Sequence, residues 1–428
     1  MALVSNNNNS FIGKVKGEIF NNMVTILFVV LCIIGIKLSG QSISFVLTEL
    51  VIRIARNSFL VLSLIIPVMA GMGLNFGIVI GAMAAQIAII AVTHWEISGL
   101  GGFMLCVLLS TPLAIIFGYL TGVLLNKTKG QEMITSMILG YFANGLYQLL
   151  FLFLVGTLIP MKNAKLMIPG GVGIKNTVDI NGGIKYALDD IWKKNGLDVL
   201  YYGVIIAVVM ILLWSIFKYV KYKNKTISFY KREIILIVVC ALLYGSLYIP
   251  YITKTLSVVS VPIVTMIIIL VLCLFNVLIF KTKLGQDFRT VGQSLNVANA
   301  SGINVNKTRV IAIIISTVLA AWGQLIFLQN IGTLNTYGSH EQVGMFAIAA
   351  ILIGGATVSK ATNKQAILGV VLFHTLFIVS PMAGKNLFDN AQIGEYFRVF
   401  VAYGVICVSL ALYAWKKLVE SKRDLKSE

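Results

Sequence analysis

Long, uninterrupted runs of apolar residues recur along nearly the whole chain. A bilayer core about 30 Å thick selects for helical runs of about 20 such residues, because a helix rises about 1.5 Å per residue. Hydrophobic residues make up 58% of the 428 positions and charged residues only 12%, about half the charged share of a soluble domain. The runs are continuous and not alternating, which excludes a transmembrane β-barrel. The sequence therefore predicts an all-α polytopic membrane protein, with residues 1–428 forming a single transmembrane domain.

About twelve segments have the length and composition of a span. They lie near residues 22–39, 57–72, 74–93, 103–124, 132–157, 199–219, 233–250, 256–280, 309–330, 342–358, 365–383 and 396–416. Residues 42–56 contain Glu49 and Arg53 and are too charged for a span, so they predict an interfacial helix. The apolar run after Lys14 and Lys16 is long and lacks a small-residue cleavage site. It is predicted to be the first transmembrane helix and not a signal peptide.

Basic residues predict the orientation of the spans. Lysine and arginine gather in segments that twelve spans, starting inside, place together in the cytoplasm: residues 126–132, 218–232, 359–364 and the charged tail 418–428. Both termini are therefore predicted to be cytoplasmic. The net charge of +18 follows from this rule and from attraction to anionic lipid, so no nucleic-acid partner is predicted. The five cysteines all lie in apolar segments without metal-ligand spacing, and no metal site is predicted.

Two regions depart from a simple array of straight helices. Pro67 and the glycines at 71–77 disfavour a continuous helix there. A broken helix beside a water-filled cavity and tight packing through small residues, such as Gly81 and Ala84, explain this region equally well. Residues 159–198 form one long loop, predicted to be extracytoplasmic and to contain a short amphipathic helix. Both a cap over the outer mouth, or a partner contact, and a solvated connection are compatible with its composition.

The chain lacks the motifs of a nucleotide-hydrolysing or metal-dependent enzyme. It contains no G-x-x-x-x-G-K-[ST] loop, no H-E-x-x-H pair and no G-x-S-x-G elbow. Carriers driven by protons or sodium place Asp, Glu or Arg at mid-membrane, and the predicted spans contain almost none away from their ends. The sequence therefore predicts a non-catalytic membrane subunit that depends on a partner subunit to hydrolyse ATP.

The polar stretch QDFRTVGQSLNVANASGINVNKTR, residues 286–309, stands between two apolar runs. Read as one helix, it carries its apolar residues on one face: Phe288, Val291, Leu295 and Ala298. Gly302 is placed to end that helix in the left-handed conformation. The stretch therefore predicts a short amphipathic helix on the cytoplasmic surface. Periodicity alone leaves open whether this helix rests among lipid headgroups or contacts another protein.

Four glycine-containing motifs follow one another along the chain. They are GLNFGIVIGAMAAQIAII (73–90), GQEMITSMILGYFANGL (130–146), KTKLGQDFRTVGQSLNVANASGI (281–303) and EQVGMFAIAAILIGGATV (341–358). In this order they resemble the permeases of ABC importers in the branched-chain amino acid, ribose and nucleoside group. The second motif is more similar to the nucleoside and simple-sugar members. In the third, Ser294, Leu295 and Val297 depart from the family pattern, and SKATNK replaces the usual glycine-rich continuation after the fourth.

The resemblance implies an architecture similar to the vitamin-B12-importer permease, with about 10–12 transmembrane helices in two related halves, in a bacterial plasma (inner) membrane. It implies that the loop 281–309 contains the coupling helix, which sits in a cleft of an ABC ATPase subunit. The residues assigned to this contact are Gly285, Arg289, Gly292, Leu295, Ala298, Ser301, Gly302 and Ile303. Further implied partners are an extracellular solute-binding (lipo)protein and a second permease copy or paralogue. ATP-Mg is then bound by the partner subunit, with no cofactor on this chain.

The function predicted from this resemblance is import of a small polar solute, a nucleoside or simple sugar. Polar and aromatic side chains inside the spans are candidates for lining the path, because they supply hydrogen bonds and stacking faces. They are Asn75, Phe76, Gln86, Asn144, Gln148, Trp322, Gln324 and His374. Each alone is also explained by packing or by hydrogen bonds between helices. One alternative is branched-chain amino acid import, disfavoured by the lack of a mid-span Lys or Arg for a carboxylate. The other is an ATP-independent secondary carrier or channel.

Overall fold

The computed structural model describes residues 22–222 and 230–427, and these residues are mostly helical. The helices are α2 (Met23–Ser39), α3 (Ile43–Ser63), α4 (Ile65–Met69), α5 (Ile78–His94), α6 (Gly99–Lys127), α7 (Glu132–Leu149), the π-helix η2 (Leu150–Leu154), α8 (Gly196–Tyr222), α9 (Lys231–Ser246), α10 (Pro250–Val258), α11 (Ile263–Ile279), α12 (Lys283–Gln293), α13 (Leu295–Ala300), α14 (Val305–Ile331), α15 (Ser339–Ile353), α16 (Asn363–Phe388) and α17 (Ala391–Ser427). The strands are β1 (Thr177–Asp179), β2 (Lys193–Asn195), β3 (Ser260–Pro262) and β4 (Thr333–Asn335). The prediction of an all-α polytopic membrane protein is confirmed.

Seven helices in the described ranges are long and apolar enough to cross a membrane, or nine if each of two bent pairs is one span. The bent pairs are α9 with α10, at 86°, and α11 with α12, at 75°. Three further apolar helices, α2, α5 and α15, have only 15 to 17 residues. At about 1.5 Å per residue, none of these three covers a hydrocarbon core about 30 Å thick. Several predicted spans are therefore bent or short.

The predicted interfacial helix at residues 42–56 is wrong. α3 and α4 together form one 27-residue span, Ile43–Met69, most of which is buried inside the protein. Within it Glu49 and Arg53 pair at 3.8 Å, and α3 packs against α14 and α16. Charged residues are tolerated in a span where protein and not lipid surrounds them. This span departs from the expectation that the spans hold almost no charge away from their ends, because Arg56 lies halfway along it.

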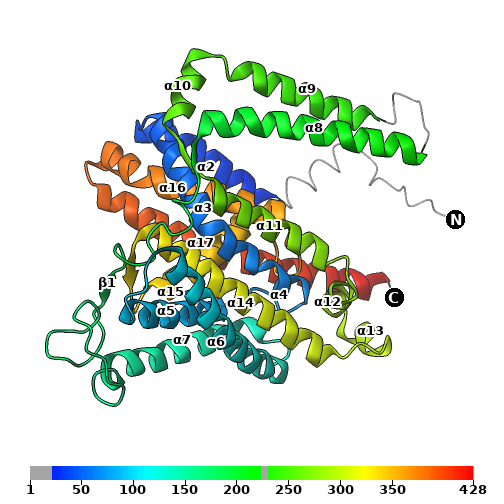
Figure 1. The fold of residues 1–428 in the computed structure, drawn as a ribbon. Helices are drawn as coiled ribbons and strands as arrows, with labels where there is room; N and C mark the ends of the chain where they lie inside the picture. Colours follow the sequence, from blue (N-terminus) through cyan, green and yellow to red (C-terminus); the bar gives the residue numbers. More distant parts are fainter. Residues whose placement is uncertain (1–21, 223–229, 428) are drawn as a thin grey trace.

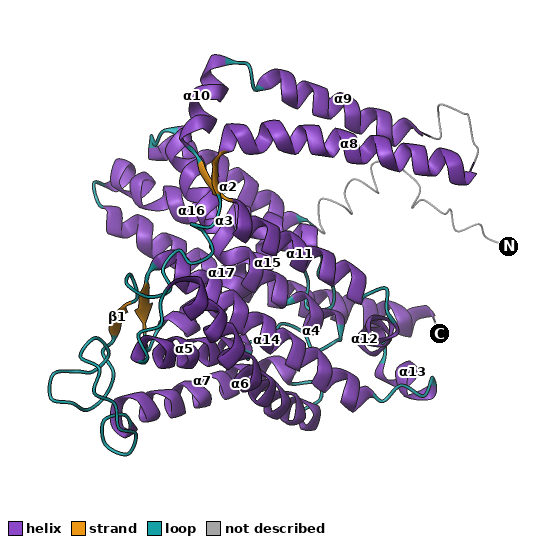
Figure 2. Cartoon of the chain, viewed as in Figure 1, coloured by secondary structure: helices purple, strands orange, loops and turns teal. Residues whose placement is uncertain are grey.

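The two ends of the helix bundle differ (Figure 1). One end, here called the α12 face, carries α12, α13 and the C-terminal end of α17. The opposite end, here called the loop face, carries the long loop 159–198 and the short strands (Figure 2). The basic segments 126–132 and 359–364 lie on the α12 face, where Asn126 donates to the Asn306 carbonyl and Val358 lies beside Gly73. These two basic segments, which were predicted to share one side, therefore do so, whereas residues 223–229 of the predicted segment 218–232 lie outside the described residues.

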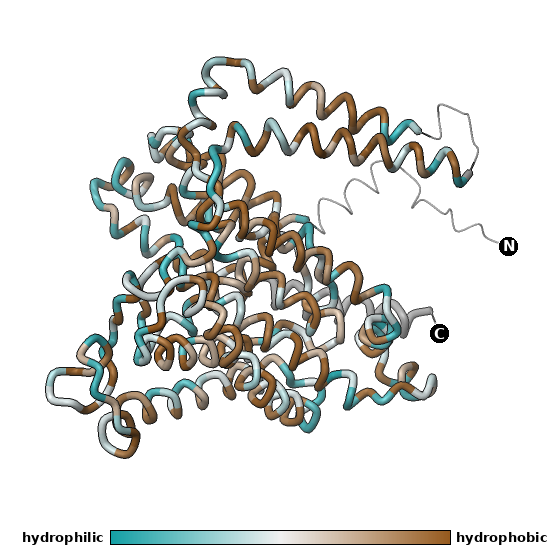
Figure 3. Tube along the Cα trace, viewed as in Figure 1, coloured by the Kyte–Doolittle hydropathy of each residue, from teal (hydrophilic) through white to brown (hydrophobic). Residues whose placement is uncertain are grey.

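The helices pack around α14, which contacts α3, α5 and α6. α8 and α9 stand outside this bundle as a hairpin, and none of the α8 span is buried by the rest of the protein. Figure 3 shows both helices as predominantly apolar. The hairpin therefore presents its side chains to lipid or to another membrane-embedded chain.

The loop 159–198 forms an ordered cap on the loop face. β1 pairs with β4 and β2 pairs with β3, so the loop is held at two places to the segments next to α14 and α11. Six of its apolar side chains are buried in the core: Leu166, Ile174, Val178, Ile180, Ile184 and Leu188. A solvated connection is therefore excluded. The amphipathic helix predicted within the loop is wrong, because residues 181–191 form a run of turns.

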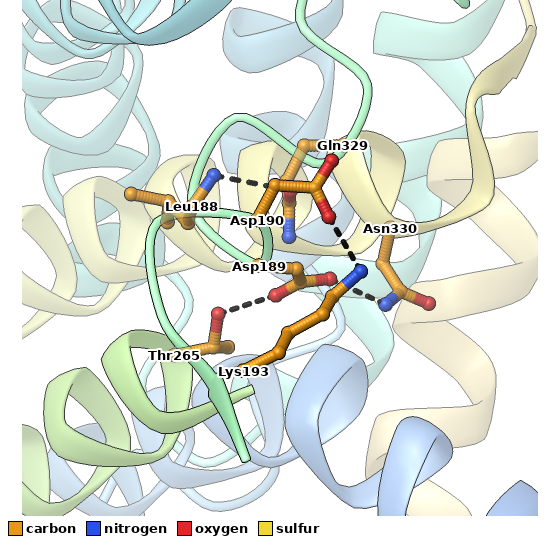
Figure 4. Close-up of polar contacts among 7 residues, drawn as sticks. All are labelled: Leu188, Asp189, Asp190, Lys193, Thr265, Gln329 and Asn330. Carbon is orange, nitrogen blue, oxygen red and sulfur yellow. Dashed lines mark hydrogen bonds and ion pairs between the residues drawn. The ribbon is translucent and has the colours of Figure 1, made fainter. Parts of the chain in front are cut away.

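Asp189 fastens this cap to two spans (Figure 4). Only 2% of Asp189 is exposed. Its carboxylate accepts hydrogen bonds from the Thr265 hydroxyl on α11 and, at 2.7 Å, from the Asn330 amide on α14. The neighbouring Asp190 instead forms a surface pair with Lys193. Two adjacent aspartates therefore have different roles, one buried and one exposed.

We expect Asp189→Ala to loosen the cap. Thr265 and Asn330 lose their shared acceptor, and a buried polar group left unpaired costs about 1–3 kcal/mol. The measurement is limited trypsin digestion of the purified protein, because Lys185, Lys193 and Lys194 lie in the cap. The matched control is Asp190→Ala, whose exposed pair contributes about 0–1 kcal/mol. Equal digestion rates for the two variants would show that Asp189 does not hold the cap.

Candidate functional site in the middle of the bundle

Buried polar side chains meet between α5, α7 and α15. After α14 ends, β4 and the turn at 336–338 lead the chain back into the bundle, so α15 begins beside the middle of α5 and α7. α5 likewise begins after the irregular segment 70–77. The predicted break near Pro67 is thus confirmed, and Gly81 additionally packs against the Thr317 carbonyl. Helices that start inside the membrane are where transporters build solute sites.

His340, Gln86, Asn144 and Glu341 form one hydrogen-bonded chain. With its nitrogen toward the ring, the Gln86 amide donates to His340 Nδ1 (2.9 Å), to the Thr336 carbonyl (3.2 Å) and to the Tyr147 hydroxyl (3.1 Å). Its oxygen then accepts from the His340 backbone N–H at 3.2 Å. Because Nδ1 accepts, the ring proton sits on Nε2, which donates to Asn144 Oδ1 at 2.9 Å. Asn144 in turn donates to Glu341 Oε2 at 3.4 Å.

In this hydrogen-bonded chain, a neutral imidazole lies between two amides, and a carboxylate follows the second amide. His340 and Gln86 are fully buried, and the Tyr147 ring lies against the imidazole at a tilt of 53°, with ring centroids 5.1 Å apart. Glu341 lies in the first turn of α15, where the helix dipole favours a negative charge. Such a set offers donors, acceptors and aromatic faces to an uncharged polar solute.

A small cavity of about 30 Å³ adjoins Asn144 and Glu341. Its lining residues come from the start of α5, from α7 and from α15: Phe76, Val79, Met137, Gly140, Tyr141, Asn144, Glu341 and Met345. This volume holds about one water molecule. The outer side of α7 is exposed, with Tyr141 56% and Phe142 62% accessible. The cavity therefore lies near a wall of the protein that no other helix within residues 22–222 and 230–427 covers.

The structure brings four of the eight predicted path residues to this site. Phe76 lines the cavity, Gln86 and Asn144 belong to the hydrogen-bonded chain, and Gln148 donates to Asn144 Oδ1 at 3.4 Å. Sequence reasoning missed His340, Glu341 and Tyr147 as members. The available signal was position in the sequence, because Glu341 begins the fourth motif, His340 directly precedes it and Tyr147 directly follows the second motif.

The other four predicted path residues lie elsewhere. Asn75 accepts from the Gly77 N–H within the broken segment (3.0 Å), and Trp322 donates to the Thr111 hydroxyl on α6 (3.0 Å). Gln324 donates to the Ser339 hydroxyl at 3.2 Å and so supports the start of α15 without joining the chain. His374 is buried on α16, where the charges of Arg53 and Arg56 act on it.

The predicted single helix over 286–301 is instead two helices that meet at Ser294. The Ser294 backbone is extended, with φ −158° and ψ 119°, and its hydroxyl accepts from the Val297 N–H, so it caps α13. Serine favours such a cap because its side chain competes with the helix for backbone donors. Gly302, with φ +74°, ends α13 as predicted. Ala298 is buried, packed with Val291 and Val305.

The backbone where α4 ends and the irregular segment 70–77 begins touches the backbone of α12. A Cβ on Gly292 would lie 2.3 Å from the Met69 carbonyl oxygen, and one on Gly71 would lie 2.7 Å from the Gly292 Cα. Only glycine permits this approach. Arg289 donates to the Phe280 carbonyl at the end of α11 (2.6 Å). α12 therefore contacts both α11 and the end of the span that precedes the site.

Comparison with known proteins places these elements in a family. The sequence profile described as branched-chain amino acid transport system / permease component matches residues 46–410. The chain belongs to this family. The match covers most of the chain and includes the mid-membrane site, the cap and α12 with α13, which confirms the resemblance inferred from the motifs. The permease is therefore a membrane component of a transport system.

Individual relatives are similar to the permease over shorter stretches. The xylose transport system permease protein of Haemophilus influenzae is 32% identical over 32% of this chain and 34% of its own length. An autoinducer 2 import system permease protein of Klebsiella pneumoniae is 37% identical over 20% of this chain and 25% of its own. A nucleoside ABC transporter permease protein of Lactococcus lactis is 28% identical over 33% and 42%. The permease thus aligns with less than half of each, and no solved structure matches it.

Proposed function

We propose that the permease imports a small polar solute, a nucleoside or simple sugar, driven by ATP that a partner ABC ATPase hydrolyses. The observation that supports this most is the hydrogen-bonded chain Gln86–His340–Asn144–Glu341 in the middle of the bundle, in which the imidazole and both amides are uncharged. Amide and imidazole groups suit hydroxyl and ring-nitrogen partners. The similarity to xylose, autoinducer 2 and nucleoside permeases favours the same class of solute.

In this proposal the cavity at Asn144 is the closed form of the solute site. Its present volume of about 30 Å³ is far below the roughly 300 Å³ that small-ligand pockets require. The exposed side of α7 supplies the missing room, with a second permease copy or a paralogue forming the opposite wall. A solute-binding protein would deliver the solute at the loop face, whose cap stands over the outer ends of α11 and α14.

The α12 face is then cytoplasmic, and α12 with α13 is the element that an ATPase subunit moves. Support for this comes from the exposed side chains of Leu295 and Val297 on α13, which stand beside the buried Ala298. The backbone contact between Gly292 and the end of α4 connects the ATPase side to the solute site. Of the predicted coupling residues, Gly285 and Gly292 are placed for close packing and Ser301 and Ile303 follow α13.

Ala298→Pro tests the coupling assignment. The Ala298 N–H donates to the Ser294 carbonyl at 3.0 Å, and proline removes this donor and costs about 3 kcal/mol inside a helix. We expect the permease to remain in the membrane, to lose co-purification of the ATPase, and to lose ATP-dependent uptake into vesicles. The control Ala300→Pro lies at the exposed end of α13. Uptake driven by a proton gradient without any ATPase would instead support an ATP-independent carrier.

Branched-chain amino acid import remains the second candidate. It was disfavoured because the spans were expected to lack a cation for the carboxylate, and Arg53 and Arg56 inside the Ile43–Met69 span remove that objection. Competition of the labelled solute by leucine or valine distinguishes the two candidates. Inhibition by nucleosides or sugars and not by these amino acids is the expected result.

A further inference from the structure

We propose that Arg56, together with Arg53 and His374, forms an oxyanion-binding site within the transmembrane part of the permease. Arg56 lies at the centre of the Ile43–Met69 span. Its guanidinium lies 5.7 Å from the centre of the Phe327 ring on α14. The charges of Arg53 and Glu49 act on it. In the cap, the Tyr186 N–H donates to the Gln329 carbonyl on α14 at 2.8 Å, two residues from Phe327. The site therefore lies between α3, α14 and α16, below the cap and separate from the Asn144 cavity.

The charges around Arg56 do not balance. Arg53 pairs with Glu49 on α3, and Arg398 on α17 pairs with Glu395. Together with Arg56, these four side chains make three positive and two negative groups. Arg56 forms no ion pair with any residue in the part of the chain that the structure describes. Its positive charge is therefore the unmatched one, held in a span where charges are usually paired.

Hydrogen-bond donors in the same region are also unused. Arg53 Nε, Arg56 Nε and Arg398 Nε are buried without a hydrogen-bond partner, although Arg53 Nε lies 3.8 Å from the Glu49 carboxylate, and His374 Nδ1 also lacks a hydrogen-bond partner. His374 is 5% exposed, and the charges of Arg53 and Arg56 act on its ring. A buried polar group without a partner is costly, so such groups usually mark a ligand or a water site. An aromatic face beside Arg56 only partly compensates its charge.

A ligand with a carboxylate or phosphate group meets all these requirements. Its negative charge balances Arg56, and its planar or tetrahedral oxygens match the fork of a guanidinium in two parallel hydrogen bonds. Two sources fit the position of the site, an anionic group on a water-soluble molecule that passes the cap, and the headgroup of an anionic lipid. The inference concerns binding alone and holds whether or not ATP drives the transport.

The test uses the purified full-length permease in detergent and inorganic phosphate as the probe. At constant ionic strength, replacing chloride by saturating phosphate is expected to raise the Tm by roughly 2–4 °C. Arg56→Gln is expected to abolish this rise. The matched control is Arg232→Gln, which removes the same charge from an exposed arginine on α9 and is expected to keep the full rise. Arg56→Lys keeps the charge without the fork and should give a smaller rise.

Bound lipid is measured on the same preparations by native mass spectrometry. If a headgroup occupies the site, the wild-type protein retains an anionic phospholipid that Arg56→Gln loses, and phosphate raises the Tm only after delipidation. Either pattern supports the oxyanion site and identifies its source. If the wild type and Arg56→Gln respond equally to phosphate and retain the same lipids, the proposal is overturned. Because no ATPase is present, this outcome leaves the proposed import function untouched.

Discussion

Replacing His340 by leucine is expected to lower solute uptake about 10- to 100-fold, the equivalent of roughly 1.4–2.8 kcal/mol of lost binding. The imidazole is the central member of the buried chain, accepting from Gln86 and donating to Asn144 at 2.9 Å. Leucine removes the imidazole partner of both amides, and a buried polar group that loses its partner costs about 1–3 kcal/mol. Asn144 and Glu341 then lose the orientation that presents them to the cavity.

The measurement is initial uptake of labelled nucleoside or sugar into vesicles, with permease abundance determined in the same membranes. His94→Leu is the matched control, because His94 is the last residue of α5 and does not belong to the hydrogen-bonded chain. His340→Gln retains one donor and one acceptor and is expected to recover part of the activity. Wild-type uptake by His340→Leu at normal abundance would place the solute site elsewhere.

Glu132→Ala is expected to destabilise the permease by about 3–5 kcal/mol, because it leaves a buried charge without its partner. Glu132 begins α7 and pairs with Arg309 on α14, a side chain that is 1% exposed. The Nε and Nη1 atoms of Arg309 already lack partners. Without the carboxylate, the arginine must reach water or disrupt the contact between α7 and α14.

Thermal unfolding of the purified protein measures this effect, with a fall in Tm of roughly 5 °C or more expected. Glu96→Ala is the control, because Glu96 pairs with Lys165 at 3.5 Å on the surface and both side chains are more than half exposed. The double variant Glu132→Ala/Arg309→Met removes both charges and is expected to recover most of the stability. If the double variant is no more stable than Glu132→Ala, the loss arises from packing and not from the unpaired charge.

Local features of the α12 region were largely predictable from sequence. Phe288, Val291 and Ala298 are buried as their spacing indicated, and Gly302 ends the helix as its permissive backbone suggested. The interruption at Ser294 was not predicted, because periodicity does not distinguish one amphipathic helix from two in succession. The capping hydrogen bond to Val297 decides the matter, and its strength depends on the extended backbone of the folded state.

The mid-membrane site was predictable only in part. Gln86, Asn144 and Gln148 stood out as polar residues within apolar runs, but so did Trp322 and Asn75, which lie elsewhere. Composition alone cannot tell a residue that joins a site from one that fastens two helices. Residues far apart in sequence, such as Gln86 and His340, are brought together by the early start of α15.

The sequence of the loop 159–198 predicted less of its structure. Its lysines and glycines allowed a solvated connection, whereas Asp189 is buried against Thr265 and Asn330. The Tyr337 hydroxyl donates to the Ile174 carbonyl at 2.7 Å and adds a second fastening. Burial raises the pKa of Tyr337 to about 12, so this donor keeps its proton at physiological pH.

By itself the sequence determined that the chain is a helical membrane protein of the transport permease family, because bilayer thickness selects run length and family motifs are local. Tertiary structure decided where charge can reside. Glu49 and Arg53 made residues 42–56 too charged for a predicted span, yet α3, which carries them, packs against α14 and α16. The solvation of a charged side chain depends on what surrounds it in three dimensions, and hydropathy along the chain does not contain that information.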